Sequence, residues 1–135
     1  MEVMSIVAAL SLSLVLQDCP QSPNCVSSQA SDPKRLVEPF SYKGRDLASA
    51  QKALLKALAS LPRIEIVSQE GDSLKATATS QVFGFVDDLD FIFDDKNKLI
   101  QVRSASRKGY WDFGVNAQRV EELRQAFQEA LKQSL

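Results

Sequence analysis

The chain has 135 residues, of which 44% are hydrophobic and 24% are charged, and this is the composition of one globular domain. Sixteen Lys and Arg residues against 17 Asp and Glu residues give a net charge of −1, so the basic excess typical of nucleic-acid binders is missing. The sequence has no histidine, which excludes histidine-based catalytic triads and most protein zinc sites. We therefore expect no metal, no cofactor and no nucleic-acid partner.

An apolar stretch opens the chain, with the sequence VMSIVAALSLSLVL over residues 3–16. It is shorter than the roughly 20 residues that span a bilayer, but its length suits the apolar part of a signal peptide. The flanks of a signal peptide are missing, because no Lys or Arg precedes Lys34 and no small-residue cleavage pattern follows Leu16. Residues 1–18 therefore have three open interpretations: a degenerate export signal or membrane anchor, a helix packed on the domain, or a partner-binding segment.

Two cysteines follow this stretch, Cys19 and Cys25, and Pro20 and Pro23 bend the spacer between them. Two cysteines without a histidine cannot hold zinc, and the spacing is not that of a C-x-x-C redox motif. We expect a small disulfide loop if the protein is exported, and free thiols in a reducing compartment. The location that we expect is export or membrane association through residues 3–16, with a cytoplasmic protein as the alternative.

Residues 19–135 predict a single α+β domain. Residues 26–45 show no periodicity and are expected to form an extended arm. A helix over residues 47–61 follows, with Asp46 as its N-cap, and a last helix begins after Asn116 as its N-cap. Between the helices lie four strand-like stretches joined by short links, which require antiparallel pairing. The expected architecture is a four-stranded antiparallel meander with two helices packed on one face, in the order α-β-β-β-β-α.

The strand pattern also predicts the registers of two hairpins. In the first hairpin, a three-residue loop pairs Ile66 with Ala76. In the second, a two-residue turn at Lys96–Asn97 places Asp90 opposite Arg103. A turn one residue earlier would place another aspartate opposite Arg103, so this arginine has an aspartate partner in either register.

Asp87 interrupts the apolar face of its strand, and a buried carboxylate must be paired or hydrogen-bonded. The register of the second hairpin brings it opposite Ser106. We expect one shared polar network at the ends of the third and fourth strands, in which Asp112 returns to pair with Arg103 or Arg107. The candidate residues of this network are Asp87, Asp88, Arg103, Ser104, Ser106, Arg107, Asp112, Asn116 and Arg119.

The same residues also permit interpretations as a binding site or a catalytic site. The three cations between Arg103 and Lys108 favour the binding of an anion, although the five aspartates at positions 87–95 would repel it. Asp87 and Asp88 could act as paired carboxylates or bind a divalent cation, but adjacent strand residues point to opposite faces. A serine nucleophile would have no histidine base. A structural network is therefore the leading interpretation.

Tyr110, Trp111 and Phe113 lie in the loop that follows the fourth strand. Most of the aromatic residues of the chain fall between Phe83 and Phe113, in the strands and in this loop. Two interpretations stay open for them. They either belong to the hydrophobic core, or Tyr110, Trp111 and Phe113 rim a pocket or a partner surface.

Three motifs in this order resemble the family of the domain of unknown function 1499. They are CPQSPNCVSS at residues 19–28, FGFVDD at residues 83–88, and RSASRKGY at residues 103–110, continued by GVN at 114–116 and RVE at 119–121. The resemblance implies a small domain of bacteria and photosynthetic lineages, often carried behind a signal or membrane segment. It implies no established activity.

We expect a non-enzymatic binding or protein-interaction module, tethered to a membrane or exported, with an unknown protein partner or small ligand. The support is the absence from the sequence of histidine, of a phosphate-binding loop and of a metal-ligand cluster. The alternative is a small hydrolase-like enzyme that uses Asp87 or Asp88 with Arg103 or Arg107. Such an enzyme needs a concave site where a carboxylate and a cation converge.

Overall fold

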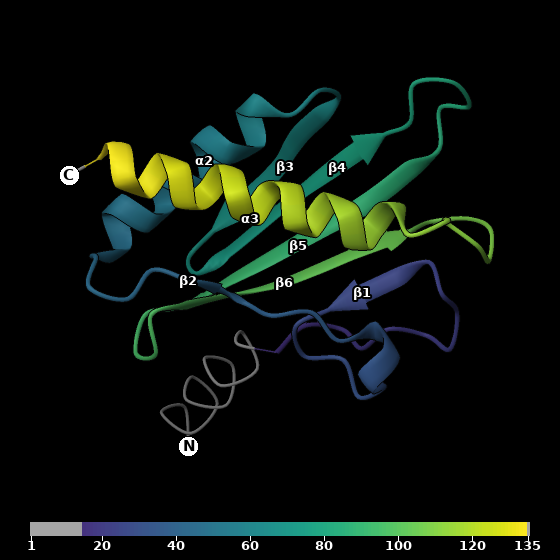
Figure 1. Ribbon diagram of the computed structural model, residues 1–135, viewed down its shortest axis with the longest axis horizontal. Helices are drawn as coiled ribbons and strands as arrows, with labels where there is room; N and C mark the ends of the chain where they lie inside the picture. Colours follow the sequence, from purple (N-terminus) through teal and green to yellow (C-terminus); the bar gives the residue numbers. More distant parts are fainter. Residues whose placement is uncertain (1–14, 135) are drawn as a thin grey trace, which may run out of the picture.

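The computed structural model describes residues 15–134, which form a two-layer α+β domain (Figure 1). Both helices cover one face of a six-stranded antiparallel sheet whose strand order is β1-β6-β5-β4-β3, with β2 also paired to β6. The elements are β1 (Cys25–Ser27), the 3-10 turn η1 (Pro33–Arg35), β2 (Phe40–Ser41), α2 (Leu47–Ser60), β3 (Ile64–Glu70), β4 (Ser73–Thr79), β5 (Val86–Asp94), β6 (Leu99–Ser106) and α3 (Val115–Gln133).

Most of the apolar stretch predicted from the sequence lies outside the described residues. Of that stretch only Val15 and Leu16 are described, and Leu16 is buried. Within residues 15–134, neither helix combines the length and the apolar character that a membrane span requires.

The α+β class, the two helices and the four-stranded meander are confirmed, but the predicted number of strands was wrong, because the sheet has six. The two additional strands come from the segment predicted as an extended arm. They pair with the outer edge of β6, Cys25 opposite Ala105 and Phe40 opposite Ile100. Strands β1 and β2 have three and two residues, which is too short to show the alternation that reveals a strand in a sequence.

The register of the second hairpin is confirmed, with Asp90 opposite Arg103 and Asp87 opposite Ser106. In the first hairpin Ile66 does pair with Ala76, but the register then shifts between Ile66 and Ser68. Because one extra residue enters this strand as a β-bulge, the hairpin closes with a two-residue loop at Gly71–Asp72 and not with the three-residue loop that was predicted.

The helix caps agree with the prediction at α2 only. The Asp46 side chain accepts a 2.7 Å hydrogen bond from the Ser49 amide, as an N-cap does. Asn116 was predicted to cap the last helix, and this was wrong. Helix α3 begins at Val115 after Gly114, which has a φ of 77°, so Asn116 lies inside the first turn with its side chain fully buried.

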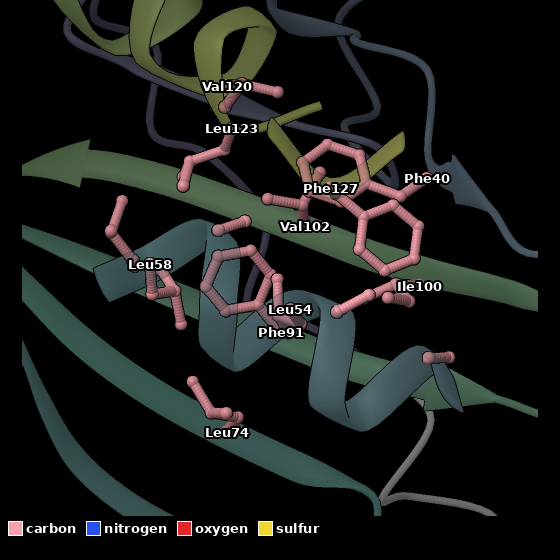
Figure 2. Close-up of a cluster of buried hydrophobic side chains, with 14 of the residues drawn as sticks. Phe40, Leu54, Leu58, Leu74, Phe91, Ile100, Val102, Val120, Leu123 and Phe127 are labelled. Carbon is pink, nitrogen blue, oxygen red and sulfur yellow. The ribbon is translucent and has the colours of Figure 1, made fainter. Parts of the chain in front are cut away.

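The core fills the space between the helices and the sheet (Figure 2). Phe91 from the sheet, Phe127 from α3 and Phe40 from β2 meet there, and the rings of Phe40 and Phe127 stack with centroids 5.6 Å apart. Truncating one of these buried rings to alanine costs about 3–5 kcal/mol. The opposite face of the sheet, which we call the open face, carries no helix within residues 15–134 and presents Lys75, Asp90 and their polar neighbours.

Candidate functional site

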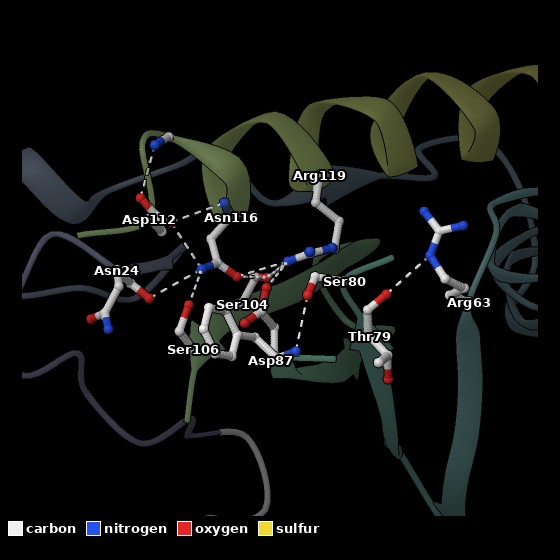
Figure 3. A network of polar contacts seen from close by, with 12 residues as sticks. Asn24, Arg63, Thr79, Ser80, Asp87, Ser104, Ser106, Asp112, Asn116 and Arg119 are labelled. Atoms are coloured by element: carbon white, nitrogen blue, oxygen red, sulfur yellow. Dashed lines mark hydrogen bonds and ion pairs between the residues drawn. The ribbon is translucent and has the colours of Figure 1, made fainter. Parts of the chain in front are cut away.

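Asn116 is the centre of a polar network at the end of the sheet where β6 leads into α3 (Figure 3). Its side-chain amide nitrogen lies 2.9 Å from an Asp112 carboxylate oxygen, 3.0 Å from the Ser106 hydroxyl and 3.1 Å from the Asn24 carbonyl oxygen. Its side-chain oxygen accepts from the Ser104 hydroxyl at 2.6 Å. One buried side chain thus connects β6, the loop before α3 and the segment before β1.

Asp87 and Arg119 form the charged part of this network. Arg119 Nη1 lies 2.8 Å from Asp87 Oδ2, and the two side chains are 15% and 10% exposed. The same nitrogen donates to the side-chain oxygen of Asn116 at 2.9 Å. The carboxylate that interrupts the apolar face of β5 is therefore neutralised by an arginine one turn into α3, and this satisfies the requirement that burial imposes.

Asp112 and Asn24 hold the two loops that flank the network. Asp112 accepts from the backbone amides of Gly114 and Asn116, at 2.8 and 3.0 Å. It was predicted to pair with Arg103 or Arg107. That prediction was wrong, because the chain turns directly into α3 and the backbone amides at the start of the helix donate to the Asp112 carboxylate. Asn24 donates from its side chain to the Gly109 carbonyl at 2.7 Å, so the cysteine loop and the loop before α3 are tied together.

The disulfide predicted for an exported protein is present between Cys19 and Cys25, whose Cα atoms lie 5.7 Å apart. Cys25 belongs to β1 and pairs with Ala105, so the bridge fastens the N-terminal segment to the edge of the sheet. Asn24 precedes this cysteine, and its carbonyl oxygen accepts from the Asn116 side chain, so the disulfide loop also contacts the network.

A hollow of about 320 Å³ lies beside the network, between the first turns of α3 and the ends of β3 and β4. Its walls carry Arg63, Glu122 and the Asp87 partner Arg119. Arg63 is itself engaged, since its Nε donates to the Thr79 carbonyl oxygen at 3.1 Å (Figure 3). The hollow is open, and its charged residues come from two parts of the chain: Arg63 from the link between α2 and β3, and Arg119 and Glu122 from α3.

Two loops project from this end of the sheet and carry exposed aromatic side chains. The end of the β4–β5 loop lies next to the start of the β6–α3 loop, because the Arg107 amide donates to the Val86 carbonyl oxygen at 3.1 Å. All exposed aromatic residues of the described chain belong to these loops, and Phe113 is 96% exposed. We call this surface the aromatic end; it comprises Val82, Phe83, Phe85, Tyr110, Trp111 and Phe113.

The two interpretations of the aromatic residues therefore apply to different residues. Phe91 and Phe93 of β5 are core residues. Tyr110, Trp111 and Phe113 are exposed, as the partner-surface interpretation requires. The contribution of the β4–β5 loop was not predicted from the sequence, although apolar residues around Gly84, outside any alternating pattern, were a signal for it.

Asp88 lies on the open face, on the other side of the strand from Asp87. It forms a bidentate pair with Arg107, whose Nε and Nη2 donate to its two oxygens at 3.0 and 2.9 Å. This contact raises the pKa of the Arg107 guanidinium. The hydrolase-like interpretation drew on Asp87, Asp88, Arg103 and Arg107, and the sheet separates Asp87 from the other three. Asp88 has both oxygens occupied by Arg107, and the enzyme alternative stays a prediction.

Arg103 departs from its predicted pairing. Asp90 is its neighbour across the hairpin, but the Asp90 carboxylate binds Lys75 of β4 at 2.7 Å. No carboxylate in residues 15–134 forms an ion pair with Arg103, although the residue is only 9% exposed. Lys75 was not among the predicted site residues, and the register of β4 against β5, which places it opposite Asp90, is the signal that identifies it.

The structure thus divides the predicted site residues among three places. The buried network holds Asp87, Ser104, Ser106, Asp112, Asn116 and Arg119, the open face holds Asp88, Arg103 and Arg107, and the aromatic end holds Tyr110 and Trp111. No group of three potential metal ligands occurs among the described residues.

The comparisons with known proteins agree with the motifs. A family model described as "Protein of unknown function (DUF1499)" matches residues 15–127, which include every element from β1 to most of α3. No curated protein matches the chain. Because the match covers most of the sequence, the chain belongs to the DUF1499 family of proteins of unknown function.

Proposed function

We propose that this domain is a non-enzymatic interaction module that binds a partner protein through the aromatic end. The observation that carries this proposal is the segregation of the aromatic side chains. Those in the strands and in α3 are buried, whereas those of the two loops are exposed, with Phe83 at 73%, Trp111 at 69% and Phe113 at 96%. Exposed aromatic clusters mark binding surfaces, and aromatic residues are enriched at the centres of protein interfaces.

The buried network supports the proposal because it fixes the loops that carry these side chains. Asp112 and Asn116 hold the start of α3, and Asn24 holds Gly109 at the base of the same loop. In the β4–β5 loop, Ser80 exchanges hydrogen bonds with the backbone of Phe85 at 2.8 and 2.9 Å. A surface presented by ordered loops loses less conformational entropy on binding than a mobile one.

We further propose that residues 3–16 tether the domain to a membrane or direct its export. The apolar composition of this stretch and the disulfide, which persists in oxidising compartments, both support this proposal. Replacing Leu10, Leu12 and Leu14 by Asn in the full chain should move the protein from the membrane or exported fraction to the cytosolic one. A wild-type chain found in the cytosol with free thiols would contradict the proposal.

The binding proposal is tested by removing the aromatic end while the fold is kept. A full-length variant carrying Phe83→Ser, Trp111→Ser and Phe113→Ser should lose the partner that co-purifies with the wild-type protein after cross-linking in native cells. Its melting temperature should change little, because these side chains contact solvent.

Val67→Ser is the matched control, since Val67 is 63% exposed but lies on β3, away from the two loops. This variant should keep the partner. Equal recovery of the partner by the wild-type protein and the triple variant would contradict the proposal, and so would cross-linking of the aromatic end to lipid alone.

A further inference from the structure

The open face carries a second hollow, of about 260 Å³, which the proposed partner surface does not use. It lies over β4, β5 and β6, and Val67 of β3 and Gln17 of the N-terminal segment also line it. The charged residues that line it are Lys75, Asp88, Asp90, Arg103 and Arg107. Three cations against two carboxylates leave this hollow with one positive charge.

That surplus charge can be assigned to one residue. Lys75 binds Asp90 at 2.7 Å, and Arg107 binds Asp88 through two hydrogen bonds, so each carboxylate already has a cation. Arg103 remains. Among the described residues, its enclosed Nε has no hydrogen-bond acceptor, and its Nη2 has only a 3.5 Å contact with the Asp18 carbonyl oxygen.

Arg103 and Arg107 lie in the same hollow and differ in this respect. Arg107 uses the edge formed by Nε and Nη2 to hold both oxygens of Asp88, which is the bidentate geometry that guanidinium groups form with carboxylates. The same edge of Arg103 has no carboxylate partner within residues 15–134. Arg103 is nine-tenths buried as a residue, and its enclosed Nε without an acceptor costs free energy, which is recovered when an anion occupies the edge.

Asp18 is a further acid close to Arg103, but its side chain does not serve as the partner. The side chain of Asp18 accepts from the Ser31 hydroxyl and amide and from the Cys19 amide. These bonds, with the Ser31 hydroxyl foremost, lower the pKa of the Asp18 carboxyl, and Arg103 contributes least among the groups that lower it. The Asp18 carboxylate is therefore committed to the loop around Ser31.

We propose that this hollow binds a small organic monocarboxylate, whose two oxygens accept from Nε and Nη2 of Arg103 in place of the long contact with the Asp18 carbonyl. A single negative charge matches the single surplus positive charge. A phosphate dianion would face Asp88 and Asp90 across the hollow, and their repulsion disfavours it. The hollow is smaller than most ligand sites, which limits the ligand to a few heavy atoms beyond its carboxylate.

The test follows the Nε–H signal of Arg103 in the nitrogen-15 NMR spectrum of the full chain. Sodium acetate and sodium propionate are titrated at constant ionic strength, with sodium chloride and inorganic phosphate as the comparison anions. The carboxylates should move this signal along a saturating curve, whereas chloride and phosphate should not. Arg35 provides the internal control, because its Nε is also enclosed without an acceptor in the described part of the chain but the residue does not line the hollow.

Two variants complete the test. Arg103→Lys keeps the charge but loses the bidentate edge, and Thr77→Leu fills the hollow from β4 without changing a charge. Each should weaken propionate binding at least tenfold, while Arg35→Lys should leave it unchanged. The proposal is overturned if the shifts are linear and equal at Arg103 and Arg35, if phosphate binds more tightly than propionate, or if both hollow variants bind like the wild-type protein.

Discussion

Asp87 of β5 and Arg119 of α3 form a largely buried ion pair of 2.8 Å that joins the end of the sheet to the first turns of the last helix. Arg119 also donates to the side chain of Asn116, which in turn contacts β6 and the cysteine loop. The pair is therefore the charged member of a network that spans four segments of the chain. Its two partners are 32 residues apart in the sequence, and only the folded chain brings them together.

Removing one member of this pair should destabilise the domain strongly. Asp87→Ala leaves the Arg119 guanidinium buried without its carboxylate, and such a change typically costs about 3–5 kcal/mol of unfolding free energy. Denaturant unfolding followed by circular dichroism measures the loss. The double variant Asp87→Leu with Arg119→Leu should recover part of it, because no charge is then left buried. A single variant as stable as the wild-type protein would show that the network does not hold this end of the sheet.

Arg103 should respond in the opposite way, because it has no carboxylate to lose among the described residues. Arg103→Met keeps the aliphatic volume and removes an unpaired, buried charge, so the free energy of unfolding should stay within about 1 kcal/mol of the wild-type value or rise. The melting temperature measured without added carboxylate tests this expectation. A loss comparable to that of Asp87→Ala would mean that Arg103 has a structural partner that the described residues do not show.

Acid should weaken the start of α2 through Asp46. Hydrogen bonds from Ser49 to the carboxylate lower the pKa of Asp46 below its ordinary value of 3.8. A lowered carboxyl pKa stabilises the folded chain above the ordinary value, and this stability is lost as the pH falls through the lowered pKa. Asp46→Asn keeps a side-chain acceptor at the N-cap but removes the titration. The decrease in melting temperature between pH 6 and pH 2 should therefore be smaller for Asp46→Asn; an unchanged decrease would refute this role.

The disulfide should contribute to stability without being required for the fold. The bridge between Cys19 and Cys25 closes a short loop, for which the loss of unfolded-state entropy corresponds to about 2 kcal/mol. The double variant Cys19→Ser with Cys25→Ser should unfold at a lower denaturant concentration and keep its far-ultraviolet spectrum. β1 is only three residues long, and it stays paired to β6 through the backbone. Complete unfolding of the double variant, or no change in its midpoint, would contradict this estimate.

The sequence predicted the parts of this structure that local patterns determine. The turn at Lys96–Asn97 was enough to place Asp90 opposite Arg103, because the turn of a hairpin determines which residues of its two strands are paired. The ion pair did not follow from that register, since a third strand supplies Lys75 to Asp90. A charged residue on a central strand can form its ion pair with either neighbouring strand, whereas the register of one hairpin describes only one of these neighbours.

The position of the last helix shows a second limit. Asn116 was assigned the capping role that its residue type favours, but Gly114 adopts a left-handed conformation and the helix starts one residue before Asn116. That shift turns the Asn116 side chain inward, where it becomes the centre of the network. Residue propensities do not locate a helix end to within one residue, yet here a difference of one residue decides the role of the Asn116 side chain.

Photo-cross-linking from Phe113 in living cells tests the central claim most directly. A photoreactive phenylalanine analogue at this position replaces a side chain that is 96% exposed, so the fold should be unaffected. We expect a discrete cross-linked protein adduct from Phe113, and its loss when Phe83→Ser and Trp111→Ser are added. The same analogue at Val67 should yield no such adduct. Identical adducts from Phe113 and Val67, or the absence of any protein adduct from Phe113, would contradict the assignment of the aromatic end as the partner surface.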